Sequence, residues 1–115
     1  MDYESNMTAA DFLEKLKEIK EEVLLIDIRT VDEFDVYHIR GAVNIDFYAD
    51  NFADMLDELD REVVCMIYCR TGRRTGTADD NALDLMREMG FCRVYNMLGG
   101  IHDFSRLPDA DDFIE

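Results

Sequence analysis

The stretch over residues 67–75, IYCRTGRRT, is the feature that most constrains what this chain can fold into. An apolar run over residues 63–68 ends at Cys69, and polar residues with a single glycine follow it. From Ala78 onwards, apolar residues recur at the spacing of one helix face. The pattern therefore predicts a strand, a tight loop and a helix, with a cysteine at the carboxyl end of the strand.

The position of Cys69 favours a chemical role for its thiol. Ligands bind at the carboxyl ends of strands in open α/β sheets, and a helix N-terminus directs N–H groups and a positive dipole at an anion. Arg70, Arg73 and Arg74 add positive charge, so a thiol there should ionise more readily than a free one. We interpret Cys69 as a nucleophile in an anion-binding loop. The alternative is a buried strand cysteine without a chemical role.

Composition narrows the classes of protein that this chain can belong to. Its 115 residues, 48% of them hydrophobic, predict one compact domain over residues 1–115. A net charge of −15 argues against binding to nucleic acid and to anionic membrane surfaces. No apolar run reaches membrane-spanning length, and the N-terminus lacks the basic and apolar regions of a signal peptide. We therefore expect a cytoplasmic location.

The three cysteines suit a reducing compartment rather than a disulfide framework. Cys65 and Cys69 would share one face of a strand about 13 Å apart, too far to pair or to hold one metal ion. Cys65 is expected in the core. Cys92 is expected to be structural or incidental, with a resolving role as the alternative. Two distant histidines make no metal site, and no cofactor is implied.

Apolar periodicity and capping signals divide the chain into alternating helices and strands. Thr8 with Asp11, and Thr30 with Glu33, mark two helix starts. Helices are predicted over residues 8 to about 21, 30–36, 52–59, 78–89 and 101–107, and strands over 23–26, 41–45, 63–68 and 91–97. Short connections between such elements predict parallel βαβ units. The fold class is thus α/β and three-layered: a small parallel β-sheet of four or five strands with helices on both faces.

Three segments of the chain resemble one known family. They are LLIDIRTVDEFDVYHIRGAVNI (residues 24–45), VVCMIYCRTGRRT (63–75) and GFCRVYNMLGGI (90–101). Together they resemble the first signature, the active-site loop and the closing segment of single-domain rhodaneses. The resemblance implies that Cys69 forms a persulfide. It also implies that the loop binds the substrate through Arg70, Thr71, Gly72, Arg73 and Arg74.

The activity that this resemblance implies is sulfur transfer. A small anionic donor such as thiosulfate would give its outer sulfur to Cys69, and a thiol or a protein would accept it, without a metal or organic cofactor. A binding or sulfur-relay module within a partner complex is the alternative. Related phosphatases use Cys-x5-Arg, whereas Cys69 and Arg74 form Cys-x4-Arg, so phosphatase activity is disfavoured.

Two departures from the family pattern stand out. Phe104 lies where members usually carry a tryptophan after the paired glycines. The helix after the loop looks about one turn longer, and it begins with Asp79 and Asp80. Negative charge near Cys69 would oppose formation of the thiolate.

Four other polar residues invite functional readings. Asp27 and Arg29 end the first strand, where a structural salt bridge is favoured over catalysis. His38 is assigned a structural hydrogen bond, because attack by a thiolate needs no general base. His102 is expected at the surface, with a substrate contact as the alternative. The glycine pair 99–100 is expected to form an unusual turn close to the active loop.

Overall fold

The computed structural model describes residues 6–19 and 22–115. Its five strands form one parallel sheet in the order β1-β5-β4-β2-β3. The strands are β1 (Asn6–Met7), β2 (Val23–Asp27), β3 (Val43–Asn44), β4 (Val64–Tyr68) and β5 (Val94–Met97). Since β4 lies at the centre and pairs with β2 and β5, the residue that follows it has neighbours on both sides.

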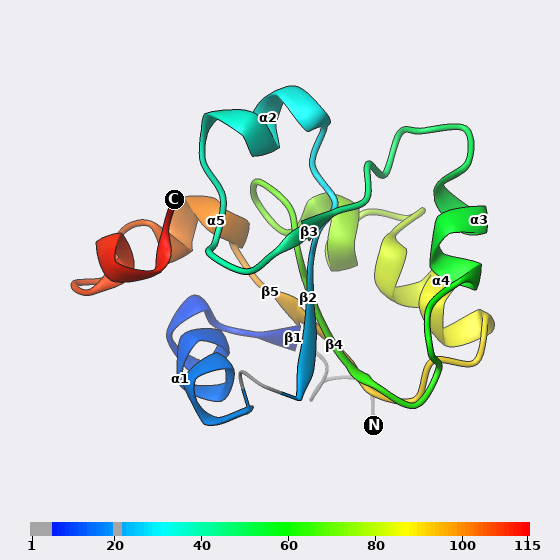
Figure 1. Ribbon diagram of the computed structural model, residues 1–115, viewed down its shortest axis with the longest axis horizontal. Helices are drawn as coiled ribbons and strands as arrows, with labels where there is room; N and C mark the ends of the chain where they lie inside the picture. Colours follow the sequence, from blue (N-terminus) through cyan, green and yellow to red (C-terminus); the bar gives the residue numbers. More distant parts are fainter. Residues whose placement is uncertain (1–5, 20–21) are drawn as a thin grey trace.

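Helices cover both faces of the sheet, which confirms the predicted three-layered α/β fold. They are α1 (Ala9–Ile19), α2 (Val31–Val36), α3 (Phe52–Asp57), α4 (Ala82–Glu88) and α5 (Gly100–Phe104), with the short turns η2 (Arg73–Thr77) and η3 (Ala110–Phe113). Figure 1 shows α1 and α5 on one side of the sheet, α3 and α4 on the other, and α2 beyond the carboxyl ends of the strands. Every described helix is too short or too polar to cross a membrane.

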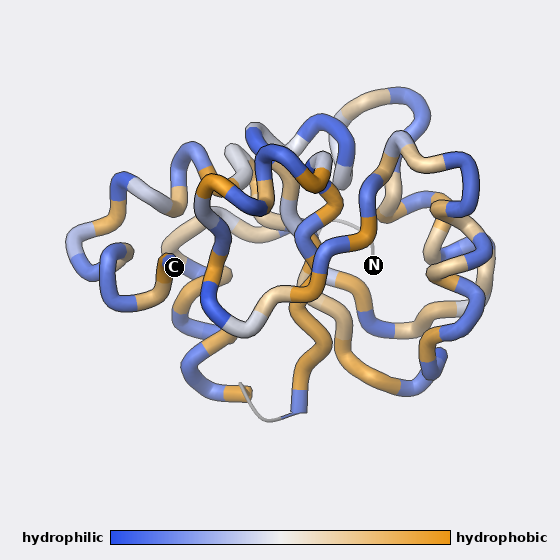
Figure 2. Tube along the Cα trace, turned by 45° about the horizontal axis from the view of Figure 1, so that its top comes forward, coloured by the Kyte–Doolittle hydropathy of each residue, from blue (hydrophilic) through white to orange (hydrophobic). Residues whose placement is uncertain are grey.

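Alternating side chains of β4 build the two cores that hold the layers together. Cys65 and Ile67 pack into the cluster beneath α3 and α4, and Cys69 extends this row beyond the strand. Met66 and Tyr68 pack into the cluster beneath α1 and α5. The hydrophobic stretches in Figure 2 accordingly run along the central strands. Because both faces are covered, the strand reads as a continuous apolar run.

The register brings two strand ends to the same level. Val23 pairs with Val64, and the pairing continues to Asp27 beside Tyr68. The amide of Ile28 donates to the carbonyl of Tyr68 at 3.0 Å and continues the ladder past the strand. The polar residues that follow β2 and β4 therefore meet at one edge of the sheet.

The largest error of the sequence prediction lies directly after the Cys69 loop. The predicted helix at Ala78 begins only at Ala82, where the Asn81 side chain caps it by accepting from the amide of Asp84 at 2.8 Å. Residues 73–77 form a π-helical turn instead. The long helix predicted over residues 78–89 is therefore wrong in its start, and α4 has only seven residues. It is η2, and not α4, that begins next to the loop.

Other boundaries differ by a few residues. The predicted strand 41–45 is reduced to β3, β5 begins at Val94, and the last predicted helix is shortened to α5. The first helix is confirmed as α1, with the amide of Asp11 donating to the Thr8 hydroxyl, and its predicted end at residues 20–21 lies outside the described residues. The Thr30–Glu33 capping box is confirmed. Sequence analysis did not predict β1 or η3, which are too short to show a periodic pattern.

Candidate active site

Cys69 lies immediately beyond β4 and is only 1% exposed. The amide of Gly72 donates a hydrogen bond to its Sγ atom at 3.1 Å. The hydroxyl of Thr75, which is also buried, lies 3.6 Å from the same sulfur. The sulfur is therefore contacted by polar groups from its own loop.

Gly72 allows the loop to close around the sulfur. Its φ of +91° lies in the left-handed region, and a β-carbon there would come within 3.0 Å of the Gly99 amide nitrogen. The carbonyl of Gly72 then accepts from the amides of Gly76 and Thr77 at 3.0 and 3.2 Å, which forms η2. The loop thus enters a helical turn at Arg73, ahead of the α-helix that the sequence predicted from Ala78.

The N-terminus of α5 anchors the other side of the loop. The amide of Ile101 donates to the carbonyl of Cys69 at 2.9 Å, and that of His102 donates to the carbonyl of Arg70 at 3.0 Å. Gly100 has a φ of +61°, and a β-carbon there would clash with the carbonyl group of Arg70. The expected glycine turn near the active loop is confirmed, and close approach of two backbones is its physical reason.

A cavity of about 440 Å³ opens in front of this loop. One wall consists of the predicted loop residues Arg70, Thr71, Arg73 and Arg74, and other walls include Phe47, Tyr48 and Asp80. Arg70, Thr71 and Arg73 are exposed, whereas Gly72 is buried against the sulfur. Four of the predicted loop residues thus share one cavity, whereas Cys69 and Gly72 are buried and are not among the residues that line it.

Arg74 is held by a carboxylate from α2. Its guanidinium donates to both oxygens of Glu33, at 2.9 and 3.2 Å, and lies 5.5 Å from the ring centre of Tyr48. The pKa of Glu33 is lowered to about 2, mainly by the hydrogen bonds from Arg74, with a contribution from the amide of Thr30. Arg74 therefore forms a fixed, charge-compensated part of the wall.

Asp27 and Arg29 form a closed pair at the end of β2, as predicted. Asp27 is completely buried, Arg29 is 3% exposed, and the two groups share several hydrogen bonds, the shortest of them 2.7 Å. Arg29 also donates to the carbonyl of Tyr37 at 2.6 Å. Neither residue lines the cavity of the loop. The pair is structural.

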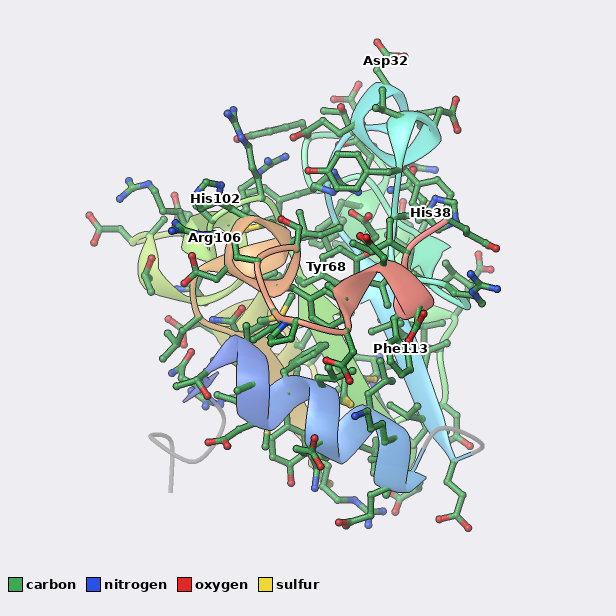
Figure 3. All side chains as sticks on the ribbon, turned by 90° about the vertical axis from the view of Figure 1, so that its left-hand side faces the viewer. Asp32, His38, Tyr68, His102, Arg106 and Phe113 are labelled. Atoms are coloured by element: carbon green, nitrogen blue, oxygen red, sulfur yellow. The ribbon has the colours of Figure 1, made fainter. Side chains whose placement is uncertain are left out.

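The two histidines occupy the predicted structural and surface positions. The Nδ1 atom of His38 lies 2.9 Å from the carbonyl of Phe34, and its ring stacks on the Phe34 ring. Its backbone pairs with that of Glu115, which ties the C-terminal segment to the chain beside α2 (Figure 3). His102 is exposed and meets the loop through its backbone amide.

The remaining two cysteines differ in exposure, and the predicted core position of Cys65 is confirmed. Cys65 is buried, and burial raises the pKa of its thiol to about 11, so it is a core residue. Cys92 is exposed on the connection before β5. Within the described residues, no group of three or more His, Cys, Asp or Glu side chains could hold a metal ion.

Sequence reasoning missed several residues that shape the site. Glu33 was recognised only as a capping residue, and Thr75 only as the end of the loop. Phe47 and Tyr48 lie on an irregular segment whose pattern carries no signal of a cavity wall. Of the two aspartates that raised a concern about charge, Asp80 lines the active cavity. Asp79 lines an adjoining one of about 330 Å³.

Comparison with known proteins assigns this architecture to a family. The model of the rhodanese-like domain matches residues 8–107, which include strands β2 to β5, the cysteine loop and α5. The chain belongs to the rhodanese-like domain family. The predicted resemblance is thereby confirmed.

Two curated relatives are sulfurtransferases by name. The Escherichia coli thiosulfate sulfurtransferase PspE is 29% identical over 80 residues, which cover 70% of this chain and 72% of PspE. The probable adenylyltransferase/sulfurtransferase MoeZ of Mycobacterium tuberculosis is 32% identical over 87 residues, covering 76% of this chain. The matched region makes up only 21% of MoeZ.

A solved structure supports the fold independently. The rhodanese-like domain of the Anabaena Alr3790 protein superposes with a TM-score of 0.76 at 19% identity. The match covers 96% of this chain and 78% of the Anabaena chain. At this identity the likeness concerns the fold, and it agrees with the parallel five-stranded sheet described above.

Proposed function

We propose that this rhodanese-like domain is a sulfurtransferase that carries sulfane sulfur as a persulfide on Cys69. The observation that carries the proposal is the buried Cys69 sulfur, 3.1 Å from the Gly72 amide, at the start of a loop whose arginines line a cavity. An N–H donor at this position can stabilise negative charge on sulfur both before and after transfer. Names of the relatives agree with this chemistry.

In the first half of the cycle, the Cys69 thiolate attacks the outer sulfur of thiosulfate or a similar donor. A bond forms between the two sulfur atoms, and the bond from the outer sulfur to the rest of the donor breaks. Sulfite leaves with the electron pair of that bond, and the negative charge of the enzyme moves to the outer sulfur of the persulfide. Arg70 and Arg73 are exposed on the cavity wall and can orient the anionic end of the donor.

In the second half, a thiophilic acceptor attacks the outer sulfur of the persulfide. The bond between the two sulfur atoms breaks, and its electron pair returns to Cys69 as the thiolate. A thiol or a protein would accept the sulfur in the cell, and cyanide would do so in an assay, leaving as thiocyanate. The cycle closes without a change in the protonation of other side chains.

A sulfur-relay module that works only within a partner complex is the second candidate. The burial of Cys69, at 1% exposure, favours it, because a partner could be needed to open the loop. A net charge of −15 suits docking on a basic partner protein. In that case, the isolated domain would accept sulfur slowly, and turnover would rise when the partner is added.

Mass spectrometry of the protein after treatment with thiosulfate tests the assignment. We expect one added sulfur atom on the peptide that contains Cys69, and its loss as thiocyanate after addition of cyanide. Cys92→Ser should behave like the wild type. Added sulfur on Cys92 alone, or none with any sulfane donor, would contradict the proposed function.

A further inference from the structure

The charges around the active cavity are more nearly balanced than the arginine-rich loop suggests. Arg70, Arg73 and Arg74 all line the cavity, but so does Asp80, and Glu33 is bonded to Arg74 from outside it. Three guanidinium groups and two carboxylates therefore leave one net positive charge. This balance determines which anions the cavity can hold well.

The Glu33–Arg74 pair removes one arginine from donor binding. Two hydrogen bonds join the guanidinium to the carboxylate, and Glu33 is itself held by the amide and hydroxyl of Thr30 at 3.0 and 3.2 Å. To bind a donor, Arg74 would have to give up a bidentate pair that the helix cap supports. Arg74 thus contributes shape to the wall and little net charge.

Arg70 and Arg73 are the cations that remain for a donor. Both are exposed, and among residues 6–19 and 22–115 neither has a side-chain ion pair. Asp80 faces the same cavity and offsets part of their field. Acidic side chains of the adjoining cavity, Asp79, Asp84 and Glu88, lower the potential of the region further.

Donors differ in the charge that they bring to this site. Thiosulfate is a dianion, and together with the Cys69 thiolate it places three negative charges at the loop. A thiosulfonate anion, in which a carbon group replaces one oxygen of thiosulfate, brings the total to two. On the basis of the proposed sulfur transfer, we propose that this domain prefers singly charged sulfane donors and that Glu33 and Asp80 set this preference.

The chemistry at Cys69 is the same for both donors. The thiolate bonds to the outer sulfur of the thiosulfonate, the bond from that sulfur to the sulfonyl sulfur breaks, and a sulfinate leaves with the electron pair. The total charge is the same before and after the step, and no oxidant or reductant takes part. The donors therefore differ in both leaving group and charge. The informative quantity is how each variant changes the ratio of the kcat/KM values for the two donors.

The test compares the methanethiosulfonate anion with thiosulfate, using cyanide as the acceptor and thiocyanate as the readout. For each variant, kcat/KM is measured with both donors at low and high ionic strength. Asp80→Asn and Glu33→Gln should each shift the ratio toward thiosulfate by roughly threefold to tenfold at low salt, and less at high salt. The Glu33→Gln variant would retain the capping box, since glutamine also serves at this position.

Matched controls remove the same charge where it does not face the cavity. Asp32 precedes Glu33 in α2, is exposed and points away from the protein (Figure 3), so Asp32→Asn is the first control. Asp111→Asn changes an exposed aspartate of η3, on the opposite side of the molecule from α3 and α4 (Figure 1). Both controls should leave the ratio of the two donors close to that of the wild type.

The outcomes separate this inference from the proposed function. A ratio that is unchanged in Asp80→Asn, or that shifts equally in the controls, would overturn the role of the two carboxylates while sulfur transfer through Cys69 still stands. A shift that persists undiminished at high salt would also overturn it, since a rearranged loop and not charge would then be responsible. Failure of both donors to modify Cys69 would overturn the sulfurtransferase assignment itself.

Discussion

Two polar clusters lie at the carboxyl ends of neighbouring strands, one after β2 and one after β4. In the first, Asp27 and Arg29 are buried and bonded to each other, and Arg29 also bonds the backbone. In the second, the Cys69 sulfur accepts one amide, while Arg70 and Arg73 extend into a cavity. Both clusters carry arginines at the same sheet edge, but only the second presents unused donors to a ligand. The Asp27–Arg29 pair is the closed cluster, and the Cys69 loop is the open cluster.

The difference shows what separates a structural polar cluster from a functional one. A buried ion pair whose hydrogen bonds are all made within the protein stabilises the local fold and offers nothing to a substrate. A site needs charged groups that are positioned by the fold but still available. The loop after β4 meets this condition. Amides of α5 hold its backbone and Glu33 holds Arg74, while Arg70 and Arg73 are available to a ligand.

The largest expected effect comes from removing the sulfur of the open cluster. Cys69→Ser should lower sulfur transfer by about a thousandfold or more, because a serine oxygen cannot carry a persulfide. The fold should persist, since the two side chains are similar in size. Thiocyanate formation and thermal unfolding measure the two properties. Cys65→Ser and Cys92→Ser should retain most activity, and loss of activity in Cys92→Ser would indicate a two-cysteine relay.

Breaking the closed cluster should affect stability instead of chemistry. Asp27→Asn leaves the buried Arg29 guanidinium without its counter-charge, which should lower the free energy of unfolding by about 3–5 kcal/mol. Denaturant unfolding measures this change. Replacing both groups, as in Asp27→Leu with Arg29→Met, should cost less than the single change. Equal costs would show that the pair adds more than mutual charge compensation.

A methyl group at Gly100 should disturb the open cluster through its anchor. The β-carbon would clash with the Arg70 carbonyl, so Gly100→Ala should displace the loop and lower kcat/KM about tenfold to a hundredfold. Gly41→Ala is the matched control, because Gly41 also has a positive φ but nothing within 4 Å of its β-carbon. It should cost about 1–2 kcal/mol of stability without a change in activity. Equal activities of the two variants would contradict the anchoring role of α5.

The smallest expected effect concerns the pair that joins α2 to the open cluster. The pKa of Glu33 is lowered from 4.5 to about 2 in the folded protein, chiefly by Arg74. Its stabilising contribution is therefore fully present above pH 4.5 and is lost as the pH falls toward 2. Glu33→Gln should be less stable by about 1 kcal/mol at neutral pH, and the difference should shrink across this window. A difference independent of pH would argue against the charge interaction.

Much of this architecture could be predicted locally. The apolar run that stops at Cys69 predicted a buried strand with a thiol at its end, because strands covered on both faces must be apolar throughout. The Thr30–Glu33 box predicted the start of α2, since capping depends on residues three apart. The start of α4 could not be predicted from periodicity. Ala78 fits the apolar spacing, but the helix is capped by Asn81. Residues 73–77, which follow Gly72, form a π-helical turn instead.

The sequence by itself thus determined the fold class and the position of Cys69 and its loop at the end of the central strand. Only the tertiary structure decided which of them are available. Glu33 reaches Arg74 across 41 positions of the chain, and the Ile101 amide reaches the Cys69 carbonyl from another helix. Such pairings depend on how the crossovers pack α2 and α5 over the sheet edge, and no local pattern encodes that packing. For this reason, three arginines that look equivalent in the sequence differ in the fold: Arg74 is paired with Glu33, whereas Arg70 and Arg73 have no ion pair within residues 6–19 and 22–115.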